Sequence, residues 1–178
     1  MIHYTKGNLL DSSAEALVNT VNTVGVMGKG IALQFKERFP MNYARYHKAC
    51  KDGKVRIGEM FVTTENSLIG NKIIINFPTK TTWRRPSEYS YIQQGLRSLR
   101  STILNMNITS IAVPPLGSHN GGLDWLRVQK MIEDSLSDLD CNIYIYEPSD
   151  HIVERLKGER VKLTPARAMT LDVLGDLI

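Results

Sequence analysis

The fold of this chain is constrained most by short apolar runs, rich in β-branched residues, that alternate with segments of helical periodicity. Such runs predict strands, which we place at residues 16–21, 60–64, 72–77, 110–113 and 142–147. The intervening segments predict helices at residues 31–39, 42–51, 88–104 and 124–139. The third helix carries one apolar stripe, formed by Ile92, Leu96, Leu99 and Ile103. The alternation predicts an α/β fold with helices packed on a central sheet.

The 178 residues are enough for one domain with a full hydrophobic core and a short appendage. The pattern changes after Pro148, and Thr164-Pro165 has the character of a helix start. A helix there would have little to pack against within the remaining residues. We therefore expect one domain over residues 1–155. Residues 156–178 are expected to be an extension that begins a linker or a second domain of a longer protein.

Composition argues against several classes of protein. Hydrophobic residues make up 42% of the chain, and no apolar run is long enough to cross a bilayer, so we expect no membrane partner. The first 16 residues lack the apolar segment of a secretory signal, which predicts a cytoplasmic location. Cys50 and Cys141 stand far apart and outside CxxC spacing. We therefore expect neither a disulfide framework nor a zinc site.

The stretch NTVNTVGVMGKGIA (residues 19–32) contains a candidate phosphate loop, and we call residues 22–31 the first glycine loop. It fails the P-loop pattern, because its glycine spacing is short and Gly30 stands where a hydroxyl residue is required. It fails the dinucleotide pattern, because Leu33 replaces the last glycine. What remains is a strand that leads through glycines into a helix, whose exposed amides attract an anion. The alternative is a tight turn that needs positive φ.

A second glycine cluster occurs in PPLGSHNGGLDW (residues 114–125), and we call residues 117–122 the second glycine loop. It also follows a predicted strand, residues 110–113, and precedes a predicted helix. Two such loops at the carboxyl ends of neighbouring strands form a crevice suited to a diphosphate. The sequence thus predicts a binding site shared by the two loops.

The order of four motifs in the chain makes the resemblance to a known family specific. These are GN-L at 7–9, VNTVNTVGVMGKGIA at 18–32, NFPTK at 76–80 and PPLGSHNGGLDW. Together they resemble the macro domain family over about residues 1–150. The resemblance is greatest to the branch of the DarG antitoxins, DNA ADP-ribosyl glycohydrolases paired with DarT toxins, and to the human terminal ADP-ribose protein glycohydrolase. It implies a three-layer α/β/α fold with a central mixed sheet, and it implies no cofactor and no metal.

The resemblance also assigns ADP-ribose contacts to residues of this chain. Asn8 and Leu9 would lie at adenine, Asn22 at the distal ribose, and Tyr146 would stack on adenine. The two glycine loops would hold the distal ribose and diphosphate through Gly28, Lys29, Gly30, Ile31, Gly117, Ser118, His119, Asn120, Gly121 and Gly122. Three alternatives stay open: Asn22 bonds only its own turn, Tyr146 belongs to the core, and His119 is an exposed loop side chain rather than a proton relay.

Lys80 is the residue that would make this chain an enzyme, and by resemblance it acts on the distal ribose. A deprotonated amine can attack the anomeric carbon, or its ring-opened aldehyde, to give a covalent intermediate that water resolves. The pKa of Lys80 must then be lowered by partial burial or by positive charge, for which Arg84 and Arg85 are candidates. The alternative is a surface lysine that contacts phosphate. On the enzymatic reading the catalytic residues are Lys80, Asn22 and His119.

The segment after Lys80 is the candidate DNA contact, because Arg84 and Arg85 can hold phosphates while Trp83 stacks on a base. We therefore expect a glycohydrolase that removes ADP-ribose from DNA bases, specifically thymidine in single strands. Its partners would be ADP-ribosylated DNA, ADP-ribose and a DarT-type toxin, the last through a missing C-terminal region. The alternatives are a reader that binds ADP-ribose without cleaving it and a hydrolase of ADP-ribosylated protein carboxylates. A kinase or dehydrogenase is disfavoured by both failed phosphate motifs.

Overall fold

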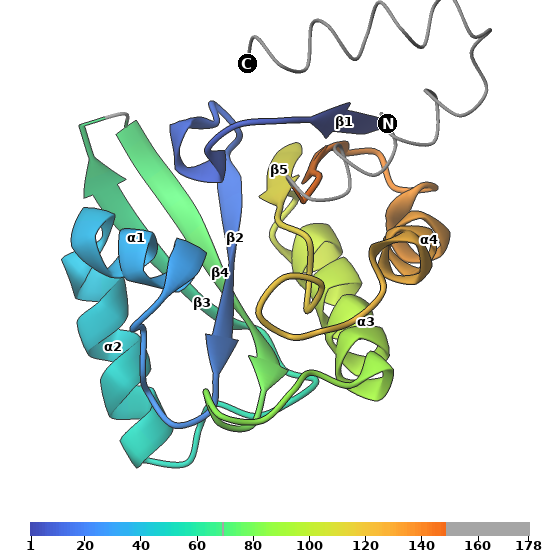
Figure 1. Cartoon of the computed structure of the whole chain (residues 1–178). Coiled ribbons are helices and arrows are strands. Elements are labelled where there is room, and N and C mark those ends of the chain that lie inside the picture. The colour runs from blue at the N-terminus through green and yellow to red at the C-terminus, as the bar shows by residue number, and fades with distance from the viewer. Residues whose placement is uncertain (69, 149–178) are drawn as a thin grey trace, which may run out of the picture. The chain divides into compact units, whose positions relative to one another are not determined.

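The computed structural model describes residues 1–68 and 70–148 and places a six-stranded mixed sheet at the centre of the fold (Figure 1). The strands are β1 (Ile2–Thr5), β2 (Ala16–Asn22), β3 (Phe61–Ser67), β4 (Gly70–Lys80), β5 (Ser110–Val113) and β6 (Asn142–Tyr146). Their spatial order is β1-β6-β5-β2-β4-β3. Neighbouring strands pair in parallel except β3 and β4, which are antiparallel.

The central strand β2 has no face open to solvent, because both of its faces are covered. Every residue from Ala16 to Asn22 is buried except Thr20, which is half-buried. Strands that are buried on both faces in a parallel sheet lack the alternation of polar and apolar residues. This explains why Ala16, Leu17 and Val18 are apolar at consecutive positions.

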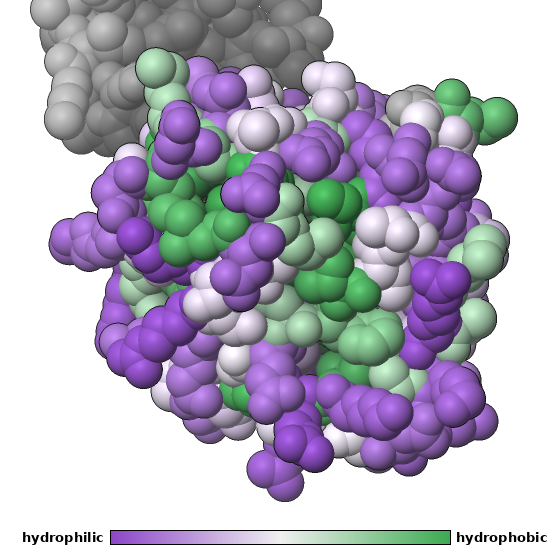
Figure 2. Space-filling model, turned by 180° about the vertical axis from the view of Figure 1, so that it is seen from behind, coloured by the Kyte–Doolittle hydropathy of each residue, from purple (hydrophilic) through white to green (hydrophobic). Residues whose placement is uncertain are grey.

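Four helices cover the two faces of the sheet (Figure 1). They are α1 (Gly30–Arg38), α2 (Pro40–Lys51), α3 (Tyr89–Asn105) and α4 (Trp125–Leu136). One core cluster joins the sheet to α3 and α4, and two smaller clusters join it to α1 and α2. The predicted three-layer α/β/α arrangement is therefore confirmed. Figure 2 shows the face behind that of Figure 1, where hydrophobic side chains gather at the centre and hydrophilic ones surround them.

A buried amide network holds α2 against β2 and β4, the strands that end at Asn22 and Lys80. The Asn19 amide nitrogen in β2 donates to Asn76 Oδ1 in β4 over 3.3 Å. The Asn76 amide nitrogen in turn donates to Asn42 Oδ1 in α2 over 2.8 Å. Glu65 accepts hydrogen bonds from the backbone amides of Met41 and Asn42, which satisfies the free donors at the start of α2. Buried polar groups bonded in this way fix the position of the helix.

The sequence located the other elements within a few residues, but it missed β1. This strand has four residues at the edge of the sheet, too short for the pattern to stand out. Helix α4 ends at Leu136 rather than at the predicted residue 139. Residues Met1–Tyr146 form one compact unit. The predicted boundary at residue 155, the extension over residues 156–178 and the helix start at Thr164-Pro165 lie outside the described residues.

Two features of the described residues concern membrane-spanning helices and the cysteines. None of their helices is long and apolar enough to cross a membrane. Both cysteines are free thiols. Burial raises the pKa of the Cys50 thiol and of the Cys141 thiol, so neither is an activated nucleophile.

Candidate functional site

The two glycine loops lie side by side at the carboxyl ends of adjacent strands. The first follows β2 and the second follows β5, and these strands pair directly. A Cβ added to Gly30 would lie 3.2 Å from the amide nitrogen of the Asn120 side chain, so the tips of the loops are in contact. Gly30 opens α1 with a φ of +57°, which glycine adopts without strain. The two loops therefore lie close together, as predicted.

The Asn22 side chain organises the first glycine loop from within. Its Oδ1 accepts hydrogen bonds from the backbone amides of Val24 and Val26 over 3.1 and 3.2 Å. Its amide nitrogen donates to the Val26 carbonyl over 2.8 Å. Asn22 thus forms hydrogen bonds within its own turn, which is the alternative to ribose binding that the sequence left open. The geometry leaves one hydrogen of the Asn22 amide for a ribose hydroxyl.

Tyr46 of α2 supports Asn22 from the buried side, and the sequence analysis missed it. Its hydroxyl donates to the Asn22 carbonyl over 2.8 Å and approaches Asn22 Oδ1 at 3.0 Å. The ring is fully buried, and this burial raises the pKa of the Tyr46 hydroxyl far above its usual range. The signal in the sequence is a tyrosine on the buried face of a helix, where its hydroxyl needs a partner.

The second glycine loop is held by backbone hydrogen bonds, and at Gly121 it leaves no room for a side chain. Leu123 N donates to the Gly117 carbonyl, and Ser87 N donates to the Gly121 carbonyl, both over 3.0 Å. A Cβ at Gly121 would collide with the Gly117 carbonyl oxygen and with Ser87 Oγ. By its spacing to Trp125, Gly121 matches an aspartate of the protein glycohydrolase relative. The loop as folded here has no space for that carboxylate.

Lys80 ends β4 and lies at the junction of the two loops. In the pairing of β2 with β4, it stands opposite Asn22, just after an irregularity in the register. Its Nζ donates to the Asn120 carbonyl over 2.6 Å. Partial burial, and then the charge of Lys29, lower the pKa of the Lys80 amine. The lysine thus has a perturbed pKa, as nucleophilic chemistry requires, and the neighbouring charge that contributes is Lys29 rather than an arginine.

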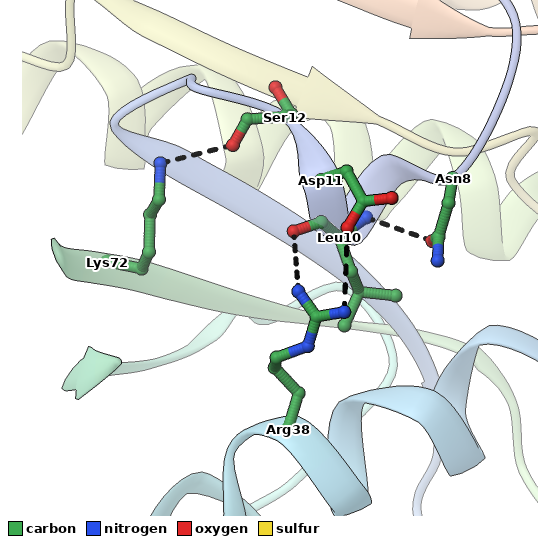
Figure 3. A network of polar contacts seen from close by, with 6 residues as sticks. All are labelled: Asn8, Leu10, Asp11, Ser12, Arg38 and Lys72. Carbon is green, nitrogen blue, oxygen red and sulfur yellow. Dashed lines mark hydrogen bonds and ion pairs between the residues drawn. The ribbon is translucent and has the colours of Figure 1, made fainter. Parts of the chain in front are cut away.

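The candidate adenine end is a short loop that two cations hold in place (Figure 3). Asn8 caps the 3-10 helix Leu9–Asp11 by accepting from Leu10 N over 3.1 Å. Arg38 of α1 donates to the Leu10 carbonyl, and Lys72 of β4 donates to the carbonyls of Ser12 and Ala14. Burial lowers the pKa of the Lys72 amine, because desolvation disfavours its charged form.

The other residues expected near adenine differ in exposure. Asn8 is exposed, whereas the Leu9 side chain is buried in a core cluster. Tyr146 packs half-buried against the same cluster, as does Ile31 of the first glycine loop. Of Leu9, only the backbone is therefore available to a ligand. Tyr146 has both core contacts and an accessible part.

The remaining loop residues are accessible to solvent. Gly28, Lys29, His119, Asn120 and Gly122 are exposed, and Ser118 is half-buried with its hydroxyl donating to the Leu116 carbonyl. In the described part of the chain, His119 makes no hydrogen bond or ion pair. Its placement agrees with an exposed loop side chain and also allows contact with a bound substrate.

The candidate DNA-contact residues lie next to the first glycine loop. Thr23 donates to the Thr81 carbonyl through its amide and, over 2.8 Å, through its hydroxyl. Trp83 is 52% exposed, and the Arg84 guanidinium lies 4.5 Å from the centre of its ring. Arg85 is also exposed. An exposed aromatic ring with adjacent cations is suited to an unpaired base and its phosphates.

Across residues 1–68 and 70–148, no group of three or more His, Cys, Asp or Glu side chains could hold a metal ion. The polar atoms gathered at the junction of the loops are instead an amine, a carbonyl and backbone amides. This set can bind anions and supply a nitrogen nucleophile.

Comparisons with known proteins show the family and agree with the fold. The macro domain family model matches residues 18–132. The chain is 48% identical to a DNA ADP-ribosyl glycohydrolase of Thermus aquaticus over 98% of its own length and 50% of the relative's. It thus spans about half the length of the curated relatives it matches.

Two solved structures resemble the fold. One is the macrodomain of Mycobacterium tuberculosis DarG, with 55% identity, a TM-score of 0.81 and coverage of 84% of this chain and 99% of that chain. The other is Thermosipho africanus DarTG in complex with ADP-ribose, with 32% identity, a TM-score of 0.79 and coverage of 84% and 42%.

Proposed function

This chain belongs to the macro domain family, and we propose that it is a DNA ADP-ribosyl glycohydrolase. Its substrate on this proposal is ADP-ribose attached to a base, thymidine, in single-stranded DNA. The name of the Thermus aquaticus relative, at 48% identity, supports the reaction. The complex of Thermosipho africanus DarTG with ADP-ribose supports the ligand.

In the proposed reaction, the neutral amine of Lys80 attacks the anomeric carbon of the distal ribose. The new carbon–nitrogen bond forms as the N-glycosidic bond to the base breaks, and the base leaves with that electron pair and takes up a proton. Water then cleaves the lysine adduct and releases ADP-ribose. Asn22 and the first glycine loop orient the ribose, and the amides of both loops bind the diphosphate. His119, which is exposed in the second glycine loop, is assigned to proton transfer on this proposal.

The single observation that carries the proposal is the placement of Lys80. Its Nζ is held by the Asn120 carbonyl of the second glycine loop, opposite Asn22, and its pKa is lowered. An amine fixed between two anion-binding loops is positioned for the anomeric carbon of a ribose whose diphosphate those loops hold. A reader of ADP-ribose would need the loops but not an amine of lowered pKa.

The test is a comparison of the chain with its Lys80→Ala variant. We expect the variant to bind free ADP-ribose with a dissociation constant close to that of the parent, because the glycine loops are unchanged. Release of ADP-ribose from a modified oligonucleotide should stop. Turnover by Lys80→Ala at the parent rate would remove the lysine from the mechanism and favour a different nucleophile.

The alternative substrate, an ADP-ribosylated protein carboxylate, is disfavoured by the second glycine loop. That loop has no room for a carboxylate at Gly121, so the acid that the resemblance assigns to the protein glycohydrolase is absent. We further propose that a DarT-type toxin is the functional partner and that the protein acts in the cytoplasm. Side-by-side assays on modified DNA and modified protein separate the two substrates.

A further inference from the structure

The carboxyl-terminal end of α2 lies beside the candidate active site. The first glycine loop contacts the segment after β4 through Thr23 and Thr81. On its other side, the same loop contacts α2, because the Gly25 carbonyl lies 3.0 Å from Nδ1 of His47. A Cβ at Gly25 would also meet the side chain of Cys50 at 3.4 Å. In Figure 1, the end of α2 and the ends of β2 and β4 lie together at the lower edge.

This end of α2 and the turn after it carry an excess of positive charge. Five cations occur between residues 40 and 58, and Asp52 is the only acid. Lys48 is paired with Asp52 over 2.9 Å, whereas the ion pairs of the described chain leave the other four unpaired: Arg45, Lys51, Lys54 and Arg56. All four are exposed. Lys51 follows His47 by one helical turn, about 6 Å along the axis.

Exposed apolar side chains lie between these cations and the segment after Lys80. These are Val24 and Val26 of the first glycine loop, which are 48% and 41% exposed, and the segment after Lys80 adds Trp83, which is 52% exposed. The molecule thus presents Arg84 and Arg85, then an apolar middle, then the basic end of α2. A single strand of nucleic acid could bind here, with its phosphates at the cations of both ends and its unstacked bases on the apolar side chains between them.

The electrostatics of the helix explain only part of this charge. Cations in the last turn of a helix are favoured by its dipole, which accounts for Lys48 and Lys51. Lys54 and Arg56 follow the helix, and Arg45 precedes its last turn. The basic residues therefore continue beyond what helix stability requires.

We propose that the basic end of α2, formed by Arg45, Lys51, Lys54 and Arg56, is a second DNA-binding flank. The strand that bears the ADP-ribose would run from Trp83, Arg84 and Arg85 over the apolar middle to this flank. One side of the modified nucleotide is then held by Arg84 and Arg85, and the other side is held by α2. This inference rests on the proposed function, because it requires a nucleic-acid substrate.

The test uses two oligonucleotides, each with one ADP-ribosylated thymine at an end. One extends by about eight nucleotides on the 5′ side only, and the other by the same length on the 3′ side only. Binding is measured with the 178-residue chain carrying Lys80→Ala, so that turnover does not interfere. The variants added are Lys51→Gln/Lys54→Gln and Arg84→Gln/Arg85→Gln. The control is Lys130→Gln on α4, in the opposite helical layer.

We expect each double variant to weaken binding of one oligonucleotide, and the two variants to affect different ones. Each lost phosphate contact should raise the dissociation constant about fivefold at roughly 0.1 M salt and reduce the salt slope by about 0.7. The dissociation constant for free ADP-ribose should stay at the parent value in every variant. Lys130→Gln should bind both oligonucleotides with the dissociation constants of the parent. Thermal unfolding of each variant checks that these exposed substitutions leave the fold intact.

The proposal is overturned if Lys51→Gln/Lys54→Gln binds both oligonucleotides as the parent does, or if both double variants weaken the same one. Failure of the proposed function gives a different result. In that case the unsubstituted chain releases no ADP-ribose from either oligonucleotide, as judged by the mass of the DNA, whatever the binding constants are.

Discussion

Replacing Tyr46 by phenylalanine tests whether the first glycine loop depends on a buried hydroxyl. The substitution removes one oxygen and keeps the ring, so the packing of α2 is preserved. It also removes the donor that bonds the Asn22 carbonyl over 2.8 Å and approaches Asn22 Oδ1 at 3.0 Å. Because both acceptors are buried, the loss should exceed that of an exposed hydrogen bond.

The magnitude follows from what is left unsatisfied. Asn22 Oδ1 keeps its two backbone donors, so the Asn22 carbonyl bears most of the loss. A buried acceptor without its donor costs about 1–3 kcal/mol. For a chain of this length, this corresponds to a melting temperature lower by about 2–12 °C. A looser loop should also weaken ADP-ribose binding several-fold.

The assay is thermal unfolding combined with calorimetric titration of ADP-ribose. Tyr43→Phe is the matched control, since Tyr43 lies on the same helix, is half-buried, and makes ring contacts with Lys36 and His47. We expect that control to leave the ADP-ribose dissociation constant near the parent value. The reasoning is refuted if Tyr46→Phe melts and binds as the parent does.

Four further substitutions test separate parts of the structure. Gly121→Ala should abolish ADP-ribose binding and destabilise the fold by about 1–3 kcal/mol, because its Cβ would collide with the backbone; normal binding in the titration would contradict this. Lys29→Gln removes a charge that helps to lower the pKa of Lys80, so the pKa of Lys80 should rise and its neutral fraction at pH 7 should fall. The rising limb of the pH–rate profile should then move to higher pH. A limb that does not move would show that Lys29 has no influence on the pKa of Lys80. Ser87→Ala should change the free energy of unfolding by less than about 0.5 kcal/mol, because in the described structure its buried hydroxyl has no hydrogen-bond partner. Ser98→Ala loses the hydrogen bond from Met60 N and should lower the free energy of unfolding by about 1 kcal/mol. Equal losses for Ser87→Ala and Ser98→Ala in urea denaturation would contradict the view that only the Ser98 hydroxyl is bonded.

The fold was predictable from the sequence where the apolar pattern was long. Residues 110–113 match β5, and the long buried run of β4 was recognised over residues 72–77. Parallel strands that are buried on both faces are recognisable in a sequence because most of their side chains are apolar. β1 has only four residues at an edge and carries no such signal.

The site was predictable where residues adjacent in sequence act together, and less so where distant residues meet. Glycines between a strand and a helix marked both loops. The support of Asn22 by Tyr46, and the charge of Lys29 near Lys80, arise only when separate elements pack. The sequence offered Arg84 and Arg85 for that charge because they are close in the chain, whereas the fold brings Lys29 close in space.

The central claim is that Lys80 makes this chain a hydrolase of ADP-ribosylated DNA. The most direct measurement is the mass of a single-stranded oligonucleotide with one ADP-ribosylated thymine, after incubation with the chain or with Lys80→Ala. We predict that the parent chain lowers the mass by one ADP-ribose and that Lys80→Ala leaves the mass unchanged. Equal release by the two proteins, or release from modified protein but not from DNA, would contradict the account.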